Sequence, residues 1–389
     1  MLLEETPDYT LRRQGRYLIA ALARPHRVLS TCRVNGGLRE DLTHIANHQG
    51  CEGVAHDMRH AWGPEASRDG GHAHACTLAG LPPDSTALMA TAANMQCAVL
   101  ARAGRDELAV TVAATAGVLG NATRAGDPAN WHEQSDGSRP VTRAGQAASA
   151  RVVCPAEAGA GTIVVMALIN QPCTPACLVQ AAVMVTEGKS TAVLDLRMPS
   201  LQSPGLATGT GTDQLAIAAP LARAEEWERH WAGSHNSLGE LLGRATHDAV
   251  TRCLLLQNGV CAELRRTVCA ALGRHGCDES ALLECARAEL DAPTAHVFER
   301  NLMAIIHDPQ GAAAAYGLAE SVDLARAGVL HAEVAREAIL NQAALLASAV
   351  AVAPGLYPEL REGLRQRADL PPGRLAALAV VMGFARKWN

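Results

Sequence analysis

The chain has 389 residues, of which 48% are apolar and only 3% aromatic, so it holds enough aliphatic material for a large core and for two or three domains. A net charge of −5 and the lack of any block of Lys and Arg argue against a nucleic-acid partner. No apolar run reaches the roughly 18 to 20 uncharged residues that cross a bilayer, and the acidic first residues differ from a signal peptide, so we expect a cytoplasmic protein with no membrane partner.

The first predicted strand runs from Arg27 to Val34 and leads into the turn Asn35-Gly36-Gly37. Asn and Gly both tolerate positive φ, which is typical of a tight turn. We therefore expect a hairpin-like turn at this point.

Histidines crowd the next segment, from Leu42 to Cys76. The pairs with a spacing of four residues are His44 with His48 and His56 with His60. On a helix this spacing places both rings of a pair on one face, where they can chelate a divalent metal. Against a continuous helix stand Gly50, Gly53 and the pair Gly70-Gly71, and no His-Glu-x-x-His motif occurs. A polar loop whose histidines contact solvent or substrate is the alternative to a metal site.

Helices and strands alternate over the following part of the chain. The predicted elements are a helix from Asp84 to Ala101, strands from Leu108 to Val118 and from Gly161 to Asn170, a helix from Pro175 to Leu196, a strand from Gln214 to Pro220 and a helix from Ser237 to Gln257. Ser237 and Glu240 have the spacing of a capping box at the start of the last helix. The order predicts a layered α/β or α+β domain in which sheet and helices pack together.

The stretch from Ala207 to Asp213 has the composition of a binding loop. Thr208, Thr210 and Thr212 alternate with glycines. Asp213 then ends the turn just before an apolar strand. Glycine lets a ligand approach the backbone, while Thr and Asp provide donors and acceptors. The spaced Gly-Lys-Ser/Thr ending of a phosphate loop is missing, and a plain Gly-rich hairpin is the alternative.

Gly188 interrupts the predicted helix between an acid and a base, Glu187 and Lys189. Glycine within a helix costs about 1 kcal/mol relative to alanine. We therefore expect a compensating contact, which is either close approach of a ligand or tight packing against a strand.

Short motifs follow one another in order over the first two thirds of the chain. They are Asn35-Gly36-Gly37-Leu38, Thr115-Ala116-Gly117 with Asn121, Arg124-Ala125-Gly126-Asp127, Gly161-Thr162-Ile163, Thr186-Glu187 with Lys189, Thr208 to Asp213, and Ser234-His235 with Leu238-Gly239-Glu240-Leu241. From about Asp8 to Gly259 the chain resembles the adenosylcobinamide amidohydrolase family. The resemblance implies a corrinoid substrate and hydrolysis of the amide that joins a corrin side-chain carboxyl to aminopropanol, which gives adenosylcobyric acid.

The same resemblance implies the site residues. The catalytic residues are Glu187, Lys189, Thr210 and Asp213, and the substrate contacts are Asn35, Thr115, Asn121, Thr208, Thr212 and His235, with Glu240 at the edge. An unactivated amide needs a nucleophile, stabilisation of the oxyanion and a proton for the departing amine.

Several groups are candidates for these roles. The nucleophile is a threonine hydroxyl or a water held by Glu187 or Asp213, and we expect the carboxylate-assisted water. Lys189 or the loop amides stabilise the oxyanion. This chemistry does not by itself require a cofactor. The alternative is a mechanism with a divalent metal, held by His44, His48, His56 and His60.

Helical periodicity continues from Val260 to Asn389, beyond the resemblance. The predicted helices span Ser280 to Leu290, Thr294 to Ile306, Ala312 to Ala327, Ala332 to Val352, Pro358 to Ala368 and Gly373 to Lys387. We expect an amidohydrolase-like domain over residues 1–259 and an all-helical domain over residues 260–389, suited to homodimer formation, substrate covering or partner docking. A corrinoid-binding accessory protein, or a relative acting on a different amide, is the second class of function.

Overall fold

The computed structural model describes residues 1–50, 70–135, 137–141 and 161–387. The chain divides into two compact units, Met1–Cys261 and Ala262–Asn389. Sheets and helices make up the first unit, and helices alone follow in the second, which confirms the predicted fold class.

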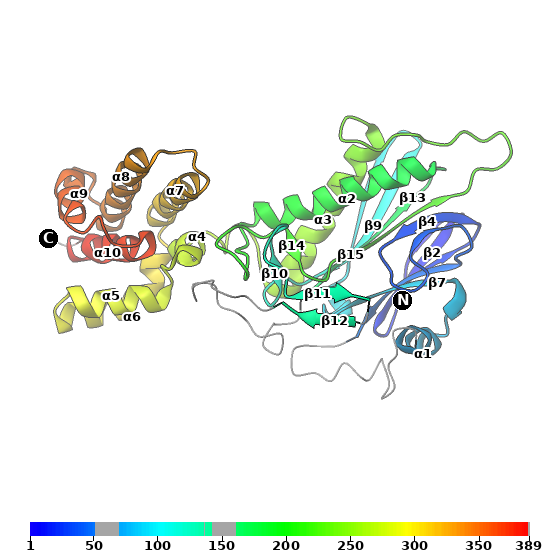
Figure 1. The fold of residues 1–389 in the computed structure, drawn as a ribbon, viewed down its shortest axis with the longest axis horizontal. Helices are drawn as coiled ribbons and strands as arrows, with labels where there is room; N and C mark the ends of the chain where they lie inside the picture. The colour runs from blue at the N-terminus through cyan, green and yellow to red at the C-terminus, as the bar shows by residue number, and fades with distance from the viewer. Residues whose placement is uncertain (51–69, 136, 142–160, 388–389) are drawn as a thin grey trace. The chain divides into compact units, whose positions relative to one another are not determined.

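Two main sheets organise the first unit (Figure 1). In spatial order, the first sheet contains β1 (Leu2–Glu5), β2 (Tyr9–Gln14), β3 (Tyr17–Leu22), β6 (His44–Gln49) and β7 (Thr86–Thr91). The second contains β5 (Gly37–Arg39), β4 (His26–Ser30), β15 (Gln214–Pro220), β13 (Ile163–Ile169), β9 (Leu108–Ala116) and β8 (Val99–Arg105). Two short pairs lie outside these sheets, β10 (Ala122–Thr123) with β14 (Gly209–Thr210) and β11 (Trp131–Gln134) with β12 (Gly137–Pro140). The central strands β13 and β15 are parallel, so both begin at the same end of the second sheet.

Strand β13 explains why the two sheets stack. All seven of its residues are buried, as its near-continuous apolar sequence predicts. Val164, Met166 and Leu168 pack into the core between the two sheets. The alternate residues pack against helices α2 (Pro175–Asp195) and α3 (Ser237–Asn258). Helix α1 (Gly70–Ala79) covers the outer face of the first sheet, so the layers run helix, sheet, sheet, helices.

The ends of α3 follow from local sequence. The side chain of Asn236 accepts a hydrogen bond from the backbone nitrogen of Leu238, and left-handed Gly259 ends the helix. The capping box predicted for Ser237 and Glu240 is therefore wrong, because Asn236 occupies the capping position one residue earlier.

The helix predicted from Asp84 to Ala101 is also wrong. This segment contains β7, one turn of 3-10 helix at Met95–Cys97 and the start of β8. Met89 packs between the two sheets, whereas its neighbour Leu88 packs on the outer face near α1. Because both faces of β7 are covered, its apolar residues are consecutive, and they imitate the broad apolar stripe of a helix.

The described residues of the histidine-rich segment differ from both predictions made for it. Residues His44–Gln49 form strand β6, which pairs with β3 and β7, instead of a helix or a polar loop. Helix α1 begins at Gly70-Gly71, the glycine pair that argued against a continuous helix through the segment.

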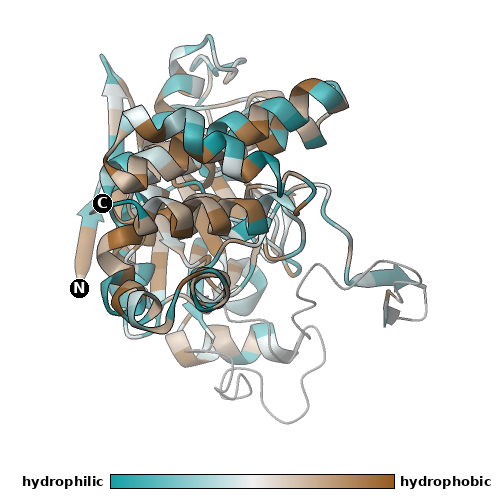
Figure 2. Ribbon diagram, turned by 90° about the vertical axis from the view of Figure 1, so that its left-hand side faces the viewer, coloured by the Kyte–Doolittle hydropathy of each residue, from teal (hydrophilic) through white to brown (hydrophobic). Residues whose placement is uncertain are grey.

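The second unit consists of packed helices. They are α4 (Val268–Leu272), α5 (Glu279–Glu289), α6 (Ala292–Ile306), α7 (Pro309–Arg326), α8 (Ala332–Ala351), α9 (Tyr357–Arg365) and α10 (Pro372–Ala385). The six predicted helices are confirmed with small shifts at their ends, and α4 is an addition. Their apolar residues form one core in which α10 is the most deeply buried, and the helices carry both apolar and hydrophilic residues along their length (Figure 2). In the part of the chain that is described, no helix combines the length and the apolar character of a membrane span.

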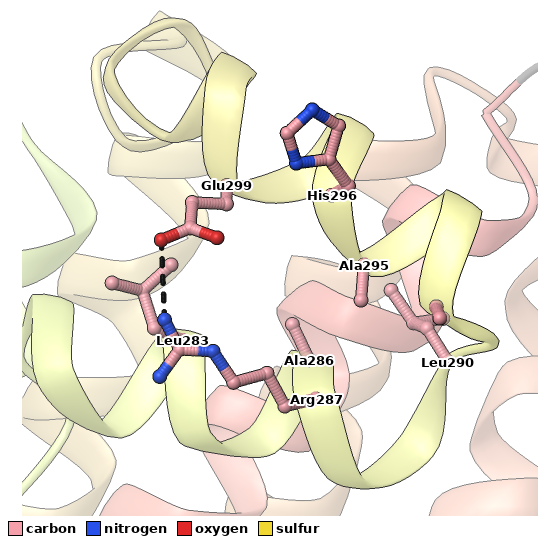
Figure 3. A pocket seen from close by; sticks show the side chains of 8 residues that line it. Leu283, Ala286, Arg287, Leu290, Ala295, His296 and Glu299 are labelled. Carbon is pink, nitrogen blue, oxygen red and sulfur yellow. Dashed lines mark hydrogen bonds and ion pairs between the residues drawn. The ribbon is translucent and has the colours of Figure 1, made fainter.

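A surface pocket of about 340 Å³ lies between α5 and α6 (Figure 3). An ion pair between Arg287 and Glu299, 3.1 Å apart, crosses it. The hollow arises because small side chains, Ala286 and Ala295, stand where the two helices face each other.

Candidate active site

The site forms where the parallel strands β13 and β15 begin. Val164 on β13 pairs with Gln214 on β15, so the preceding residues, Ile163 and Asp213, lie side by side where these two strands begin. Helix α2 follows β13 and runs back across the sheet, so Lys189 returns to the same edge. Chain segments that are far apart in sequence therefore meet at the turn that joins β14 to β15.

Asp213 is the centre of a hydrogen-bond cluster. Its Oδ2 accepts from Lys189 Nζ at 2.7 Å and from the backbone nitrogen of Thr210 at 3.0 Å. Its Oδ1 accepts from the Thr210 hydroxyl at 2.5 Å and from the backbone nitrogen of Ile163 at 3.0 Å. The side chains of Lys189 and Asp213 are only 15% and 16% exposed, so water screens this ion pair weakly. A carboxylate, an ammonium group and a hydroxyl are thus in direct contact.

Gly209 makes room for this cluster. A Cβ at that position would collide with the carboxylate of Asp213 and with the ammonium group of Lys189. The glycine therefore has a steric reason in the folded state, in addition to the flexibility expected of the loop.

A second group of polar contacts holds Thr212, the exposed tip of the turn. Its hydroxyl lies 2.7 Å from the hydroxyl of Thr162 and 3.2 Å from the carbonyl oxygen of Gly161. Asn121 Nδ2 donates to Thr212 Oγ1 at 3.4 Å and to the Gly161 oxygen at 3.0 Å. The turn is therefore fixed by the loops that precede β13 and follow β9.

Thr208 fixes another loop. Its hydroxyl accepts a hydrogen bond from the backbone nitrogen of Ala125 at 2.9 Å. Asp127 holds the same loop by accepting from the backbone nitrogen of Arg124 at 2.7 Å and from the hydroxyl of Ser200 at 2.5 Å. Thr208 thus ties the loop from Arg124 to Asp127 to the turn that carries Asp213.

Glu187 does not join the cluster. It is exposed, and it stands two residues from Lys189 on α2. Residues with that spacing point to opposite sides of a helix, so Glu187 faces away when Lys189 faces Asp213.

Asn35 and Thr115, both predicted to contact substrate, bind other parts of the protein. Asn35 has positive φ, as its turn predicts, and its Nδ2 donates to the backbone oxygens of Pro83 at 2.8 Å and Thr86 at 3.0 Å. Thr115 is 0% exposed, and its hydroxyl accepts from Asn47 Nδ2 at 2.9 Å. These two residues connect the second sheet and its turn to the first sheet.

His235 and Glu240 lie at the start of α3. His235 is exposed. Glu240 forms ion pairs with Arg105 at 2.8 Å and with Arg244 at 2.5 Å. In the described part of the chain, neither side chain forms a hydrogen bond or an ion pair with the Asp213 cluster.

The structure contradicts the geometry assumed for half of the metal site predicted on four histidines. His44 and His48 lie on strand β6, where residues four apart are separated by about 13 Å, too far to bind one ion. His48 is buried and stacks on Tyr17 with ring centroids 4.4 Å apart. His56 and His60 lie outside the described residues. Among the described residues, no group of three or more His, Cys, Asp or Glu is placed to hold a metal ion.

Sequence reasoning missed Thr162 as a site residue. The side chain is 6% exposed, and its hydroxyl bonds to Thr212 in the candidate site. The motif Gly161-Thr162-Ile163 was the available signal, because it precedes the strand that runs beside the threonine-rich turn.

Fold and site together describe a layered α/β protein in which a hydroxyl, a carboxylate and an ammonium group are in contact. Comparison with known families specifies the class further. The model of the family described as adenosylcobinamide amidohydrolase matches residues 3–262, which is well over half of the chain. The chain belongs to this hydrolase family. It is also similar to an uncharacterized protein of Methanocaldococcus jannaschii, with 28% identity over 182 residues that make up 46% of this chain and 67% of that protein.

Proposed function

We propose that this protein hydrolyses the amide bond between aminopropanol and the corrin ring of adenosylcobinamide, giving adenosylcobyric acid for corrinoid salvage. Membership of the family supports the choice of substrate. The contact of Thr210, Asp213 and Lys189 carries the proposal, because it offers a nucleophile, a base and a positive charge in one place.

Thr210 is our candidate for the nucleophile. Its hydroxyl donates to Asp213 Oδ1 at 2.5 Å, the relation of a nucleophile to its general base, while Lys189 orients that base from the other oxygen. The sequence favoured a water held by a carboxylate. Both oxygens of Asp213 already accept two hydrogen bonds each, which supports the bound hydroxyl over an additional water.

The proposed reaction proceeds in two halves. Thr210 Oγ1 bonds to the amide carbon and its proton moves to Asp213, while the oxyanion lies near the ammonium group of Lys189. The carbon–nitrogen bond then breaks, and the proton passes from Asp213 to aminopropanol. Water next attacks the ester with Asp213 as base, which releases the carboxyl product and restores the Thr210 hydroxyl.

The function is tested by incubating the protein with adenosylcobinamide and measuring free aminopropanol and adenosylcobyric acid. Release of both in equal amounts is the expected result. A change in the corrin spectrum on binding without any release would instead identify a corrinoid-binding accessory protein.

The nucleophile is tested at Thr210. We expect Thr210→Val to lower kcat at least about 100-fold, and Thr210→Ser to retain it within about tenfold because the hydroxyl remains. Mass spectrometry after an acid quench should detect the corrin ester on the parent and not on Thr210→Val. Turnover of Thr210→Val within about tenfold of the parent would show that a water attacks instead.

A further inference from the structure

We infer, on the basis of the proposed function, that Asn121 determines specificity because its side-chain oxygen accepts the N–H of the scissile amide. Asn121 lies between β9 and β10, beside the tip of the Thr210–Asp213 turn. Under this assignment the enzyme requires a secondary amide, whose nitrogen carries a hydrogen.

The neighbours of Asn121 determine which side-chain atom faces them. Nδ2 lies 3.0 Å from the carbonyl oxygen of Gly161, and a carbonyl can only accept a hydrogen bond. Nδ2 also donates to Thr212 Oγ1 at 3.4 Å. These two bonds occupy both hydrogens of the amino group, so Oδ1 is the atom that faces away from Gly161.

Packing holds this side chain in one orientation. A Cβ on Gly161 would lie only 3.2 Å from the Cβ of Asn121, so the two segments are already in contact. The backbone nitrogen of Asn121 donates to the oxygen of Val118 at 3.2 Å, which closes the turn after β9. Because the residue is fixed before a ligand arrives, little side-chain entropy is lost on binding.

Oδ1 points toward the exposed part of the turn. A Cβ on Gly211 would lie 3.4 Å from Oδ1, and Gly211 itself is exposed. Within residues 1–50, 70–135, 137–141 and 161–387, no group donates a hydrogen bond to Oδ1. Its acceptor capacity is therefore available to a ligand.

An acceptor at this point matches the shape of an amide. A trans amide presents its C=O and its N–H on opposite sides. Lys189 Nζ lies against Gly209 as a donor for the C=O, and Asn121 Oδ1 lies against Gly211 as an acceptor for the N–H.

The test compares two substrates in two proteins. One substrate is adenosylcobinamide, and the other is its ester analogue, in which an oxygen replaces the scissile N–H. We expect Asn121→Ala to lower kcat/KM for the amide by roughly 10-fold to 100-fold and for the ester by less than about threefold. Thr162→Val is the matched control, since it removes a contact to Thr212 in the same cluster and should lower both values by one common factor.

An equal loss on amide and ester for Asn121→Ala overturns the inference and leaves the hydrolase function standing. A parent protein that releases product from neither substrate overturns both proposals. If Asn121→Ala fails to fold, Asn121→Ser provides the same comparison, because its shorter side chain cannot reach the amide hydrogen.

Discussion

At the scale of single residues, the site depends on a shielded ion pair. Asp213 accepts four hydrogen bonds, and Lys189 supplies one of them from a side chain that is only 15% exposed. A positive charge held in this way needs no rearrangement when negative charge develops on a substrate oxygen. In the proposed reaction, the cluster is thus prepared for the oxyanion before the substrate binds.

Substitutions of two charged residues on α2, Lys189 and Glu187, should have contrasting effects on kcat. We expect Lys189→Met to lower kcat at least about 100-fold, because it removes the positive charge beside Asp213. Glu187→Gln, two residues earlier and exposed, should keep kcat within about threefold of the parent. Both values come from steady-state release of aminopropanol. A loss of 100-fold or more in Glu187→Gln would assign it an acid–base role after all.

The sequence identified most residues of the cluster, but it could not show in which direction each predicted side chain points. Thr210 and Asp213 share one turn, and Lys189 reaches it because a helix returns across its own sheet. Glu187 was included because a motif does not say which side of a helix each residue faces. Thr115 was included because it belongs to a motif of the resemblance, whereas its strand is buried on both faces and its hydroxyl accepts a hydrogen bond from Asn47.

At the scale of elements, Gly188 explains how α2 and α3 pack. A Cβ on Gly188 would lie 2.7 Å from the carbonyl oxygen of Gly243 on α3. The contact that compensates for a glycine within α2 is therefore another helix, and neither a ligand nor a strand as the sequence suggested.

This contact predicts opposite effects for two similar substitutions. Gly188→Ala should destabilise the first unit by about 1–3 kcal/mol, because backbone atoms have to move apart. Gly243→Ala is the control: its Cβ would meet only the end of Met184 at 3.6 Å, so the better helix propensity of alanine should prevail. Urea unfolding measures both, and equal destabilisation by the two would contradict the assigned packing.

The sequence predicts an element well when local residues determine its conformation. It predicts an element poorly when pairing with a distant strand determines it. Strands β9, β13 and β15 are short and almost continuously apolar, so their sequences lack the polar face of an amphipathic helix. Strand β7, in contrast, is built from Thr, Ala, Leu and Met, and most of these favour helices. Its parallel pairing with β6 overrides that preference, and pairing partners are not visible in a single sequence.

At the scale of the whole molecule, the two units have separate cores. Clusters around β13 fill the first unit, and a different cluster around α10 fills the second. The second was the easier to predict, because each of its helices repeats an apolar pattern every three to four residues.

Separate cores predict two unfolding transitions. We expect calorimetry of the full chain to resolve one transition for residues 1–261 and another for residues 262–389. Gly188→Ala should lower the Tm of one transition and leave the other within about 1 °C of the parent. A single transition that shifts as a whole would show that the units unfold cooperatively.

The second unit also contains a buried histidine among charges. The side chain of His275 is 0% exposed, and its Nδ1 lies 2.9 Å from a guanidinium nitrogen of Arg326. Arg274 pairs with Asp323 at 2.7 Å, and that carboxylate is 3.7 Å from His275 Nε2. Burial, followed by the charges of Arg274 and Arg326, lowers the pKa of His275 from 6.5 to about 4, against the opposing effect of Asp323.

This pKa predicts that acid weakens the helical unit. Between about pH 4 and pH 6.5 the unfolded chain binds a proton at His275 that the folded unit does not, so stability falls as the pH is lowered. From pH 7 to pH 5 we expect a loss of about 2 kcal/mol from this residue, seen as a lower Tm of the second transition.

His275→Gln should remove this part of the pH dependence. His331→Gln should preserve it, because His331 is exposed. Equal pH dependence in the parent and in His275→Gln would mean that other groups cause the acid sensitivity.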